Sequence, residues 1–166
     1  LIRLIYSESF LPAYDYILFA VTGTMFKAAS WVISFVFLAK AESKLFVINE
    51  TATNVYGLFF NLIGYHFGGL MGLGISYIII FFAYLVQVYV IARSRYGFRF
   101  TNLYKRVYSI CLILVTTSFL LVFLWHSNFV YIPTVFLFVI SCYFSIHELD
   151  KRMELTRLLK QKIYKQ

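Results

Sequence analysis

Charged residues are scarce in this chain, and acidic residues are the scarcest. Only 13% of its 166 residues are charged, with seven Asp and Glu against fifteen Lys and Arg, whereas 61% are hydrophobic. Soluble domains average about 25% charged and about 45–50% apolar residues. A chain this apolar lacks the polar groups to cover a water-exposed surface. The composition therefore excludes an ordinary soluble domain and favours a membrane protein.

Cysteine, histidine and catalytic motifs are also rare. Cys111 and Cys142 both lie inside apolar runs, which favours packing over a disulfide or a metal role. His66 and His126 have no second ligand nearby in the sequence, so we expect no metal site. The chain has no phosphate-binding glycine loop, no nucleophile elbow and no histidine box. We therefore expect no enzymatic activity, no catalytic residues and no cofactor.

Long apolar runs are what the chain has instead. A spanning helix needs about 20 apolar residues to cross a hydrocarbon core of about 30 Å. Breaks such as AKAESK at 39–44 and GYHFGG at 64–69 separate the runs. The sequence predicts an all-α polytopic membrane protein, with spans at 12–39, 45–65, 69–92, 107–125 and 129–146. These five transmembrane helices would form one bundle over residues 1–146.

Positive charge is concentrated on one side of the predicted bundle. If the five spans alternate, the loops at 40–44 and 93–106 and the tail at 147–166 share one side, and they hold every basic residue except Arg3 and Lys27. Because positive loops resist translocation, this side and the C-terminus are expected to be cytoplasmic. The basic charge thus indicates topology. A phosphodiester-binding patch at 93–106 is the alternative, and we expect no nucleic-acid partner.

The tail at 147–166 is basic, with apolar residues at near-helical intervals. Leu149, Met153, Leu159 and Ile163 are spaced among lysines and arginines. This pattern predicts an amphipathic helix on the anionic cytoplasmic leaflet. A solvated tail is the alternative.

One lysine lies deep inside the first predicted span. Lys27 is about twelve residues from the nearer end, which is beyond the reach of a snorkelling side chain. Ionisable groups inside a span are costly, so they usually face a cavity or a partner helix. Ser30 and Trp31 follow at spacings of three and four and share its helical face. Lys27 would serve either a structural ion pair or direct contact with a substrate or a coupling ion.

The second predicted span carries a polar stripe. Small and polar residues recur there at steps of three and four: Glu50, Thr53, Asn54, Gly57, Asn61 and Gly64. Such a row either bonds neighbouring helices or lines a hydrated path. Glu50 lies at an axial offset of about 10 Å from Lys27, so pairing between the two stays open. In the third span, Gly68, Gly72 and Ser76 predict close helix packing.

Four segments carry a resemblance to a known family: YSESFLPA at 6–13, TGTMFKAASW at 22–31, FLAKAESKLFVINE at 37–50 and GGLMGLGISY at 68–77. Together they resemble the C-terminal half of Wzx-type O-antigen flippases. These are polysaccharide transporters of the superfamily that includes the multidrug and toxic-compound extrusion (MATE) proteins. The resemblance covers about residues 1–95. It implies two facing six-helix lobes, and this chain would supply most of one lobe, with the N-terminal lobe missing.

The resemblance implies that the protein moves undecaprenyl-pyrophosphate-linked oligosaccharide, a repeat unit for O-antigen and lipopolysaccharide, across the bacterial inner membrane. Its partners would be this substrate, membrane lipids, the other lobe and a coupling proton or sodium ion. Lys27 would attract the pyrophosphate, and Glu50 would balance Lys27 or carry the coupling proton. Sugar contacts would come from Ser30, Trp31, Asn54 and Asn61.

Two other functions fit the same residues. A cation-coupled multidrug exporter of the same superfamily is one, although a central lysine without an adjacent acid argues against a site for organic cations. A non-transporting membrane fragment is the other.

Overall fold

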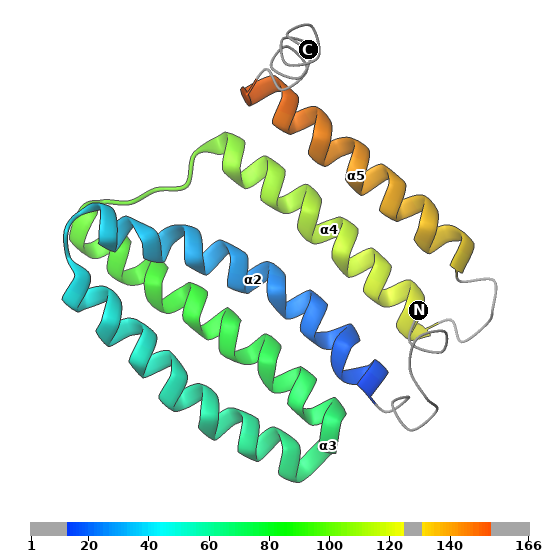
Figure 1. Ribbon diagram of the computed structural model, residues 1–166, viewed down its shortest axis with the longest axis horizontal. Helices are drawn as coiled ribbons and strands as arrows, with labels where there is room; N and C mark the ends of the chain where they lie inside the picture. The colour runs from blue at the N-terminus through cyan, green and yellow to red at the C-terminus, as the bar shows by residue number, and fades with distance from the viewer. Residues whose placement is uncertain (1–12, 125–130, 154–166) are drawn as a thin grey trace, which may run out of the picture. The chain divides into compact units, whose positions relative to one another are not determined.

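The computed structural model describes residues 13–124 and 131–153, and all elements within these ranges are α-helices (Figure 1). They are α2 (Ala13–Ala39), α3 (Ser43–Tyr96), α4 (Asn102–Leu124) and α5 (Tyr131–Met153). The all-helical prediction is confirmed. In α2, α3 and α4 the helices are long and apolar enough to cross a membrane, whereas α5 contains a shorter apolar stretch, Pro133–Glu148. The chain divides into two compact units, Leu1–Lys105 and Arg106–Gln166.

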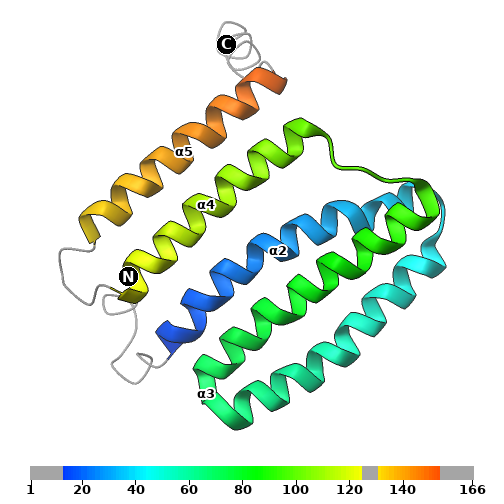
Figure 2. The same cartoon turned by 180° about the vertical axis from the view of Figure 1, so that it is seen from behind.

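Helix α3 doubles back on itself at Gly69. The backbone there has φ 55° and ψ −137°, a conformation that L side chains rarely adopt and glycine adopts freely. The residues before and after it, 43–68 and 70–96, form two limbs that lie side by side (Figures 1 and 2). We call them the first limb and the second limb. The sequence predicted a turn over 64–69, whereas helical structure continues to Gly68.

Small residues let the two limbs approach closely near the Gly69 turn. A Cβ atom added to Gly64 would lie 2.5 Å from the carbonyl oxygen of Gly72, and one added to Gly72 would meet the Gly64 carbonyl. One turn further, Ser76 Oγ donates a hydrogen bond to Asn61 Oδ1 at 2.8 Å. Gly68 has open space instead. Close packing therefore involves Gly72 and Ser76 of the predicted row.

Helix α2 packs along α3, and its contact with the second limb forms the apolar core. The fully buried core consists of Ile33, Phe37, Tyr84, Val88 and Ala92. The first limb also carries exposed apolar residues away from this contact, at Phe59, Leu62 and Ile63. An exposed apolar face on a helix of this length is what contact with lipid requires.

The turn between α2 and α3 lies at the opposite end of the first unit from Gly69. Ala41 adopts φ 59°, and the Glu42 amide donates to the Phe37 carbonyl, as at a Schellman helix end. Gly97 ends α3 in a left-handed conformation too, with φ 64°, and its amide donates to the Arg93 carbonyl at 3.0 Å. A salt bridge of 2.8 Å from Arg95 to Glu42 joins the two ends. The basic segments after α2 and after α3 are therefore on one side of this unit.

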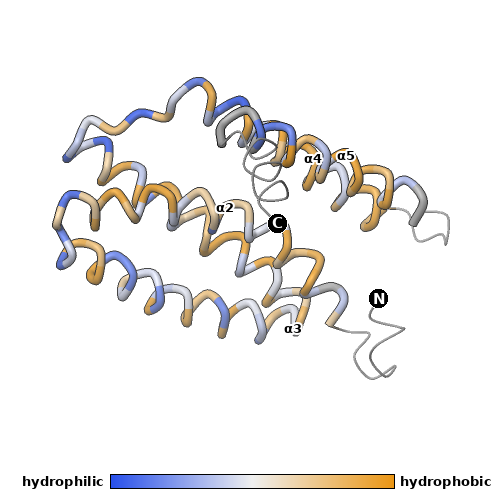
Figure 3. The backbone as a smooth tube through the Cα atoms, turned by 45° about the horizontal axis from the view of Figure 1, so that its top comes forward, coloured by the Kyte–Doolittle hydropathy of each residue, from blue (hydrophilic) through white to orange (hydrophobic). Residues whose placement is uncertain are grey.

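The second unit contains most of α4 and all of α5. Both are apolar over most of their length, with hydrophilic residues at the start of α4 and at the end of α5 (Figure 3). No residue of α4 is buried. The turn predicted around His126, the chain before Ala13 and the tail after Met153 lie outside the described residues.

Candidate functional site

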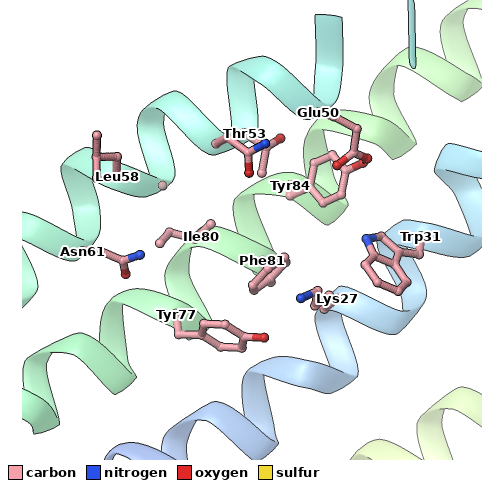
Figure 4. A pocket seen from close by; sticks show the side chains of 12 residues that line it. Lys27, Trp31, Glu50, Thr53, Leu58, Asn61, Tyr77, Ile80, Phe81 and Tyr84 are labelled. Atoms are coloured by element: carbon pink, nitrogen blue, oxygen red, sulfur yellow. The ribbon is translucent and has the colours of Figure 1, made fainter. Parts of the chain in front are cut away.

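A cavity of about 370 Å³ lies between α2 and both limbs of α3 (Figure 4). Each of the three helical segments supplies one part of its wall. Two residues come from α2, Lys27 and Trp31; six come from the first limb, Glu50, Thr53, Asn54, Gly57, Leu58 and Asn61; four come from the second limb, Tyr77, Ile80, Phe81 and Tyr84. The wall combines one cation, one carboxylate, amides and aromatic rings, so it can contact both charged and hydroxyl-rich ligands.

The Lys27 ammonium lies over aromatic rings. Its Nζ atom is 4.8 Å from the centroid of Phe81, 5.1 Å from that of Trp31 and 5.9 Å from that of Tyr77. Cation–π contacts of this kind stabilise an ammonium by about 0.5–2 kcal/mol each. Within residues 13–124 and 131–153, the salt bridge that the structure shows joins Arg95 to Glu42 and leaves Lys27 out. The rings therefore stabilise Lys27 without neutralising its charge.

Glu50 is held by two hydroxyl groups. Tyr84 donates a short hydrogen bond to Oε1 of Glu50, and Ser34 Oγ donates to the same oxygen at 3.3 Å. The two hydroxyl oxygens are themselves 2.9 Å apart. Ser34 comes from α2, Glu50 from the first limb and Tyr84 from the second limb. This cluster links all three segments beside the cavity.

The first limb presents an amide wall to the cavity. Asn54 is exposed, and Asn61 is half-buried with its Oδ1 bonded to Ser76. The Asn61 nitrogen points toward Ile80, on the cavity side (Figure 4). Thr53 is buried, and its hydroxyl donates to the Asn49 carbonyl at 2.8 Å. Amide groups donate and accept hydrogen bonds, which suits the hydroxyl groups of a sugar.

Five of the six residues that the sequence analysis selected line this one cavity. They are Lys27, Trp31, Glu50, Asn54 and Asn61. Ser30 does not line it. Its side chain is fully buried, and its hydroxyl donates to the Lys27 backbone carbonyl at 2.8 Å. Ser30, three residues after Lys27, and Trp31, four residues after it, lie on opposite sides of Lys27 around the helix axis. The cavity lies on the Trp31 side.

The aromatic wall on the second limb was not foreseen from the sequence. Tyr77, Phe81 and Tyr84 lie at spacings of four and three, which places them on one helical face. In an apolar span, the sequence pattern of such residues is the same whether their face lines a cavity, packs in a core or contacts lipid. The sequence did offer one indication of a polar site: Tyr77 and Tyr84 place hydroxyl groups well inside the apolar run 69–92. A buried hydroxyl needs a hydrogen-bond partner.

Metal binding finds no ligand set in this site. Among the described residues, no three His, Cys, Asp or Glu side chains lie close enough together to hold a metal ion. Cys111 and Cys142 are both free thiols.

No family model, curated protein or solved structure matches this chain.

Proposed function

We propose that this chain is part of a flippase that carries lipid-linked oligosaccharide, with undecaprenyl pyrophosphate as the lipid anchor, across the bacterial inner membrane. The observation that carries the proposal is the ammonium of Lys27 on the wall of a cavity, held by aromatic rings and outside any ion pair among the described residues. A pyrophosphate is a strong acceptor for such a cation.

The other walls support a substrate with sugars attached to the anion. Asn54 and Asn61 offer amide groups, and Trp31, which is 47% exposed, offers a ring face on which a sugar can stack. A carboxylate-rich site for organic cations would look different, because Glu50 is already bonded to Ser34 and Tyr84.

The proposed topology has five spans, with the two limbs of α3 counted separately and α5 as the fifth. Each limb is about as long as a bilayer crossing requires. The basic segments after α2 and α3 then lie in the cytoplasm, as does the C-terminus. The chain would form most of one lobe of a MATE-like transporter, and the facing lobe would close the substrate chamber. A proton or sodium ion would drive transport, with Glu50 as the candidate carrier.

Replacement of Lys27 tests this function. We expect Lys27→Ala in the full-length protein to reduce surface polysaccharide display at least tenfold at matched membrane levels, because the anion loses its charged partner. Lys27→Arg, which keeps the charge, should retain part of the activity. Display is measured in cells whose own copy of the gene has been deleted.

Lys44→Ala is the matched control, since Lys44 is an exposed lysine in the first turn of α3 and does not line the cavity. It should display polysaccharide like the unchanged protein. Full display by Lys27→Ala would remove Lys27 from the mechanism and with it the main support for a flippase.

A multidrug exporter is the second candidate function, because the aromatic rings and Glu50 could also contact an organic cation. The Lys27 ammonium already lies over those rings, so a second cation would meet repulsion there. Drug resistance that depends on the gene, with polysaccharide display unaffected by its deletion, would favour the exporter. A non-transporting fragment would produce neither phenotype.

A further inference from the structure

Glu50 and Lys27 line the same cavity without forming an ion pair. Opposite charges attract strongly where water is scarce, and both side chains are long enough to reorient within a shared space. In such a pair the Lys27 ammonium would be neutralised by Glu50 and would no longer be available to an anionic ligand. Glu50 is bonded instead to the hydroxyl groups of Ser34 and Tyr84.

The two hydroxyls that bind Glu50 are rigidly placed. Tyr84 is 1% exposed, and its ring belongs to the core that includes Ile33, Phe37 and Val88. Ser34 is likewise 1% exposed. Because both hydroxyl groups are enclosed by neighbouring residues, their hydrogen bonds hold the carboxylate beside Tyr84.

The ammonium of Lys27 is directed elsewhere. Figure 4 shows its nitrogen toward Phe81 and Tyr77, whereas the Glu50 carboxylate lies beside Tyr84. The acid is therefore satisfied by neutral donors and the cation by neutral rings. Each charge is stabilised, and neither cancels the other.

We propose that Ser34 and Tyr84 are positioning residues that hold Glu50 apart from Lys27 and thereby keep the Lys27 ammonium available to a phosphate-type anion. The identity of that anion, the pyrophosphate of a lipid-linked substrate, rests on the proposed function. Loss of either hydroxyl frees the carboxylate to turn toward Lys27, and the resulting ion pair competes with the anion.

The test measures binding of inorganic pyrophosphate to the purified full-length protein in detergent by isothermal titration calorimetry. The quantity compared is the binding that Lys27→Ala abolishes, so that binding to the exposed basic loops is subtracted. We expect Tyr84→Phe to weaken this binding about tenfold or more, the scale of one charge-assisted hydrogen bond. Ser34→Ala, a smaller change to the core, should act in the same direction.

A second substitution separates positioning from a general structural role. In the double variant Tyr84→Phe with Glu50→Gln, the freed side chain carries no charge, so pyrophosphate affinity should return to the level of the unchanged protein. Glu50→Gln alone should bind at least as tightly as the unchanged protein. The control is Tyr89→Phe. It removes a tyrosine hydroxyl from the same limb, but this hydroxyl accepts a hydrogen bond from Arg93 and does not contact Glu50. It should leave pyrophosphate affinity unchanged.

The outcomes distinguish this inference from the proposed function. Unchanged affinity in both Tyr84→Phe and Ser34→Ala overturns the positioning role and leaves the flippase proposal standing. A loss in Tyr84→Phe that Glu50→Gln does not restore also overturns it. If the unchanged protein binds no pyrophosphate, or Lys27→Ala binds it equally well, the anion site itself fails, and both proposals fall. Two results could also occur together: pyrophosphate binding is restored in the double variant, and polysaccharide display survives deletion of the gene. They would support the positioning role and contradict the flippase proposal.

Discussion

Asn49 shows how a single amide is accommodated between apolar helices. It is 3% exposed, its Nδ2 donates to the Leu45 carbonyl at 3.0 Å, and its Oδ1 accepts a hydrogen bond of 2.7 Å from Gln87 Nε2. The bond joins the two limbs of α3 at the end far from Gly69. Buried amides are stable only when paired in this way, because an unsatisfied polar atom is costly in an apolar setting.

We expect Asn49→Ala and Gln87→Ala each to lower stability and to be coupled in a double-mutant cycle. The coupling should be about 0.6 kcal/mol and at most about 1.7 kcal/mol, the range measured for hydrogen bonds between membrane helices. Unfolding of the detergent-solubilised protein measures it. Asn54→Ala, which alters an exposed amide of the same limb, should change stability little. Strict additivity of the two alanine variants would show that this bond contributes nothing to hairpin stability.

Single residues also show how much of the site the sequence alone can indicate. The position of Lys27 within a long apolar run, and the recurrence of Glu50, Asn54 and Asn61 at helical steps, marked these four as polar-face residues but left open whether they pack against a helix or line a hydrated path; in the structure all four line the cavity. Ser30 has the same spacing to Lys27 as a cavity residue would have, but it is buried. Periodicity assigns a residue to a face of its own helix, whereas the position of the neighbouring helix decides which part of that face is open.

At the scale of elements, α3 is organised by its glycines, and they are not equivalent. Gly64 and Gly72 are needed because the limbs are in contact there, and Gly69 is needed for its backbone conformation. Gly68 has neither constraint, since nothing lies within 4 Å of an added Cβ and its φ is not positive. The sequence could indicate a glycine-rich turn, but it could not separate these roles because all of them require the same residue.

Gly72→Ala should therefore destabilise the hairpin, by about 1–3 kcal/mol, because its methyl group would overlap the Gly64 carbonyl. Gly68→Ala is the matched control four residues away. It should be neutral or raise stability by up to about 1 kcal/mol, since alanine favours helix over glycine. Thermal unfolding followed by size-exclusion chromatography measures both. Equal midpoints for the two variants would contradict the close approach of the limbs.

The aromatic wall of the second limb is the element that the sequence could not assign. Tyr77, Phe81 and Tyr84 share a face, but an apolar helix in a bilayer presents aromatic residues to lipid, to other helices and to ligands alike. Only the packing of α2 against this limb, with Gly23 beneath the Tyr77 ring, shows that these three residues face Lys27 and Glu50.

At the scale of the whole molecule, charge placement makes the topology testable. The Arg95–Glu42 salt bridge joins the turn after α2 to the end of α3, so both basic segments of the first unit lie on one side. The Gly69 turn lies on the other side, and in the described structure the exposed side chains near it include His66.

Cysteine labelling should separate these two sides. In a protein whose Cys111 and Cys142 are replaced by serine, a maleimide that cannot cross the membrane should label His66→Cys in intact cells. It should label Lys40→Cys only after the membrane is disrupted, because the basic turn is expected in the cytoplasm. Labelling of both positions in intact cells, or of neither, would contradict separate crossings by the two limbs of α3.

The reversal of α3 at one residue constrains how the cavity could widen. Asn54 and Asn61 lie on one limb and Tyr77 and Phe81 on the other, yet the limbs are joined without a flexible loop and touch through bare backbone at Gly64 and Gly72. Separation of the two limbs would expose peptide groups to hydrocarbon, which is costly. We therefore expect the hairpin to move as one unit, so that the cavity can widen only by movement of the hairpin against α2, the helix that bears Lys27.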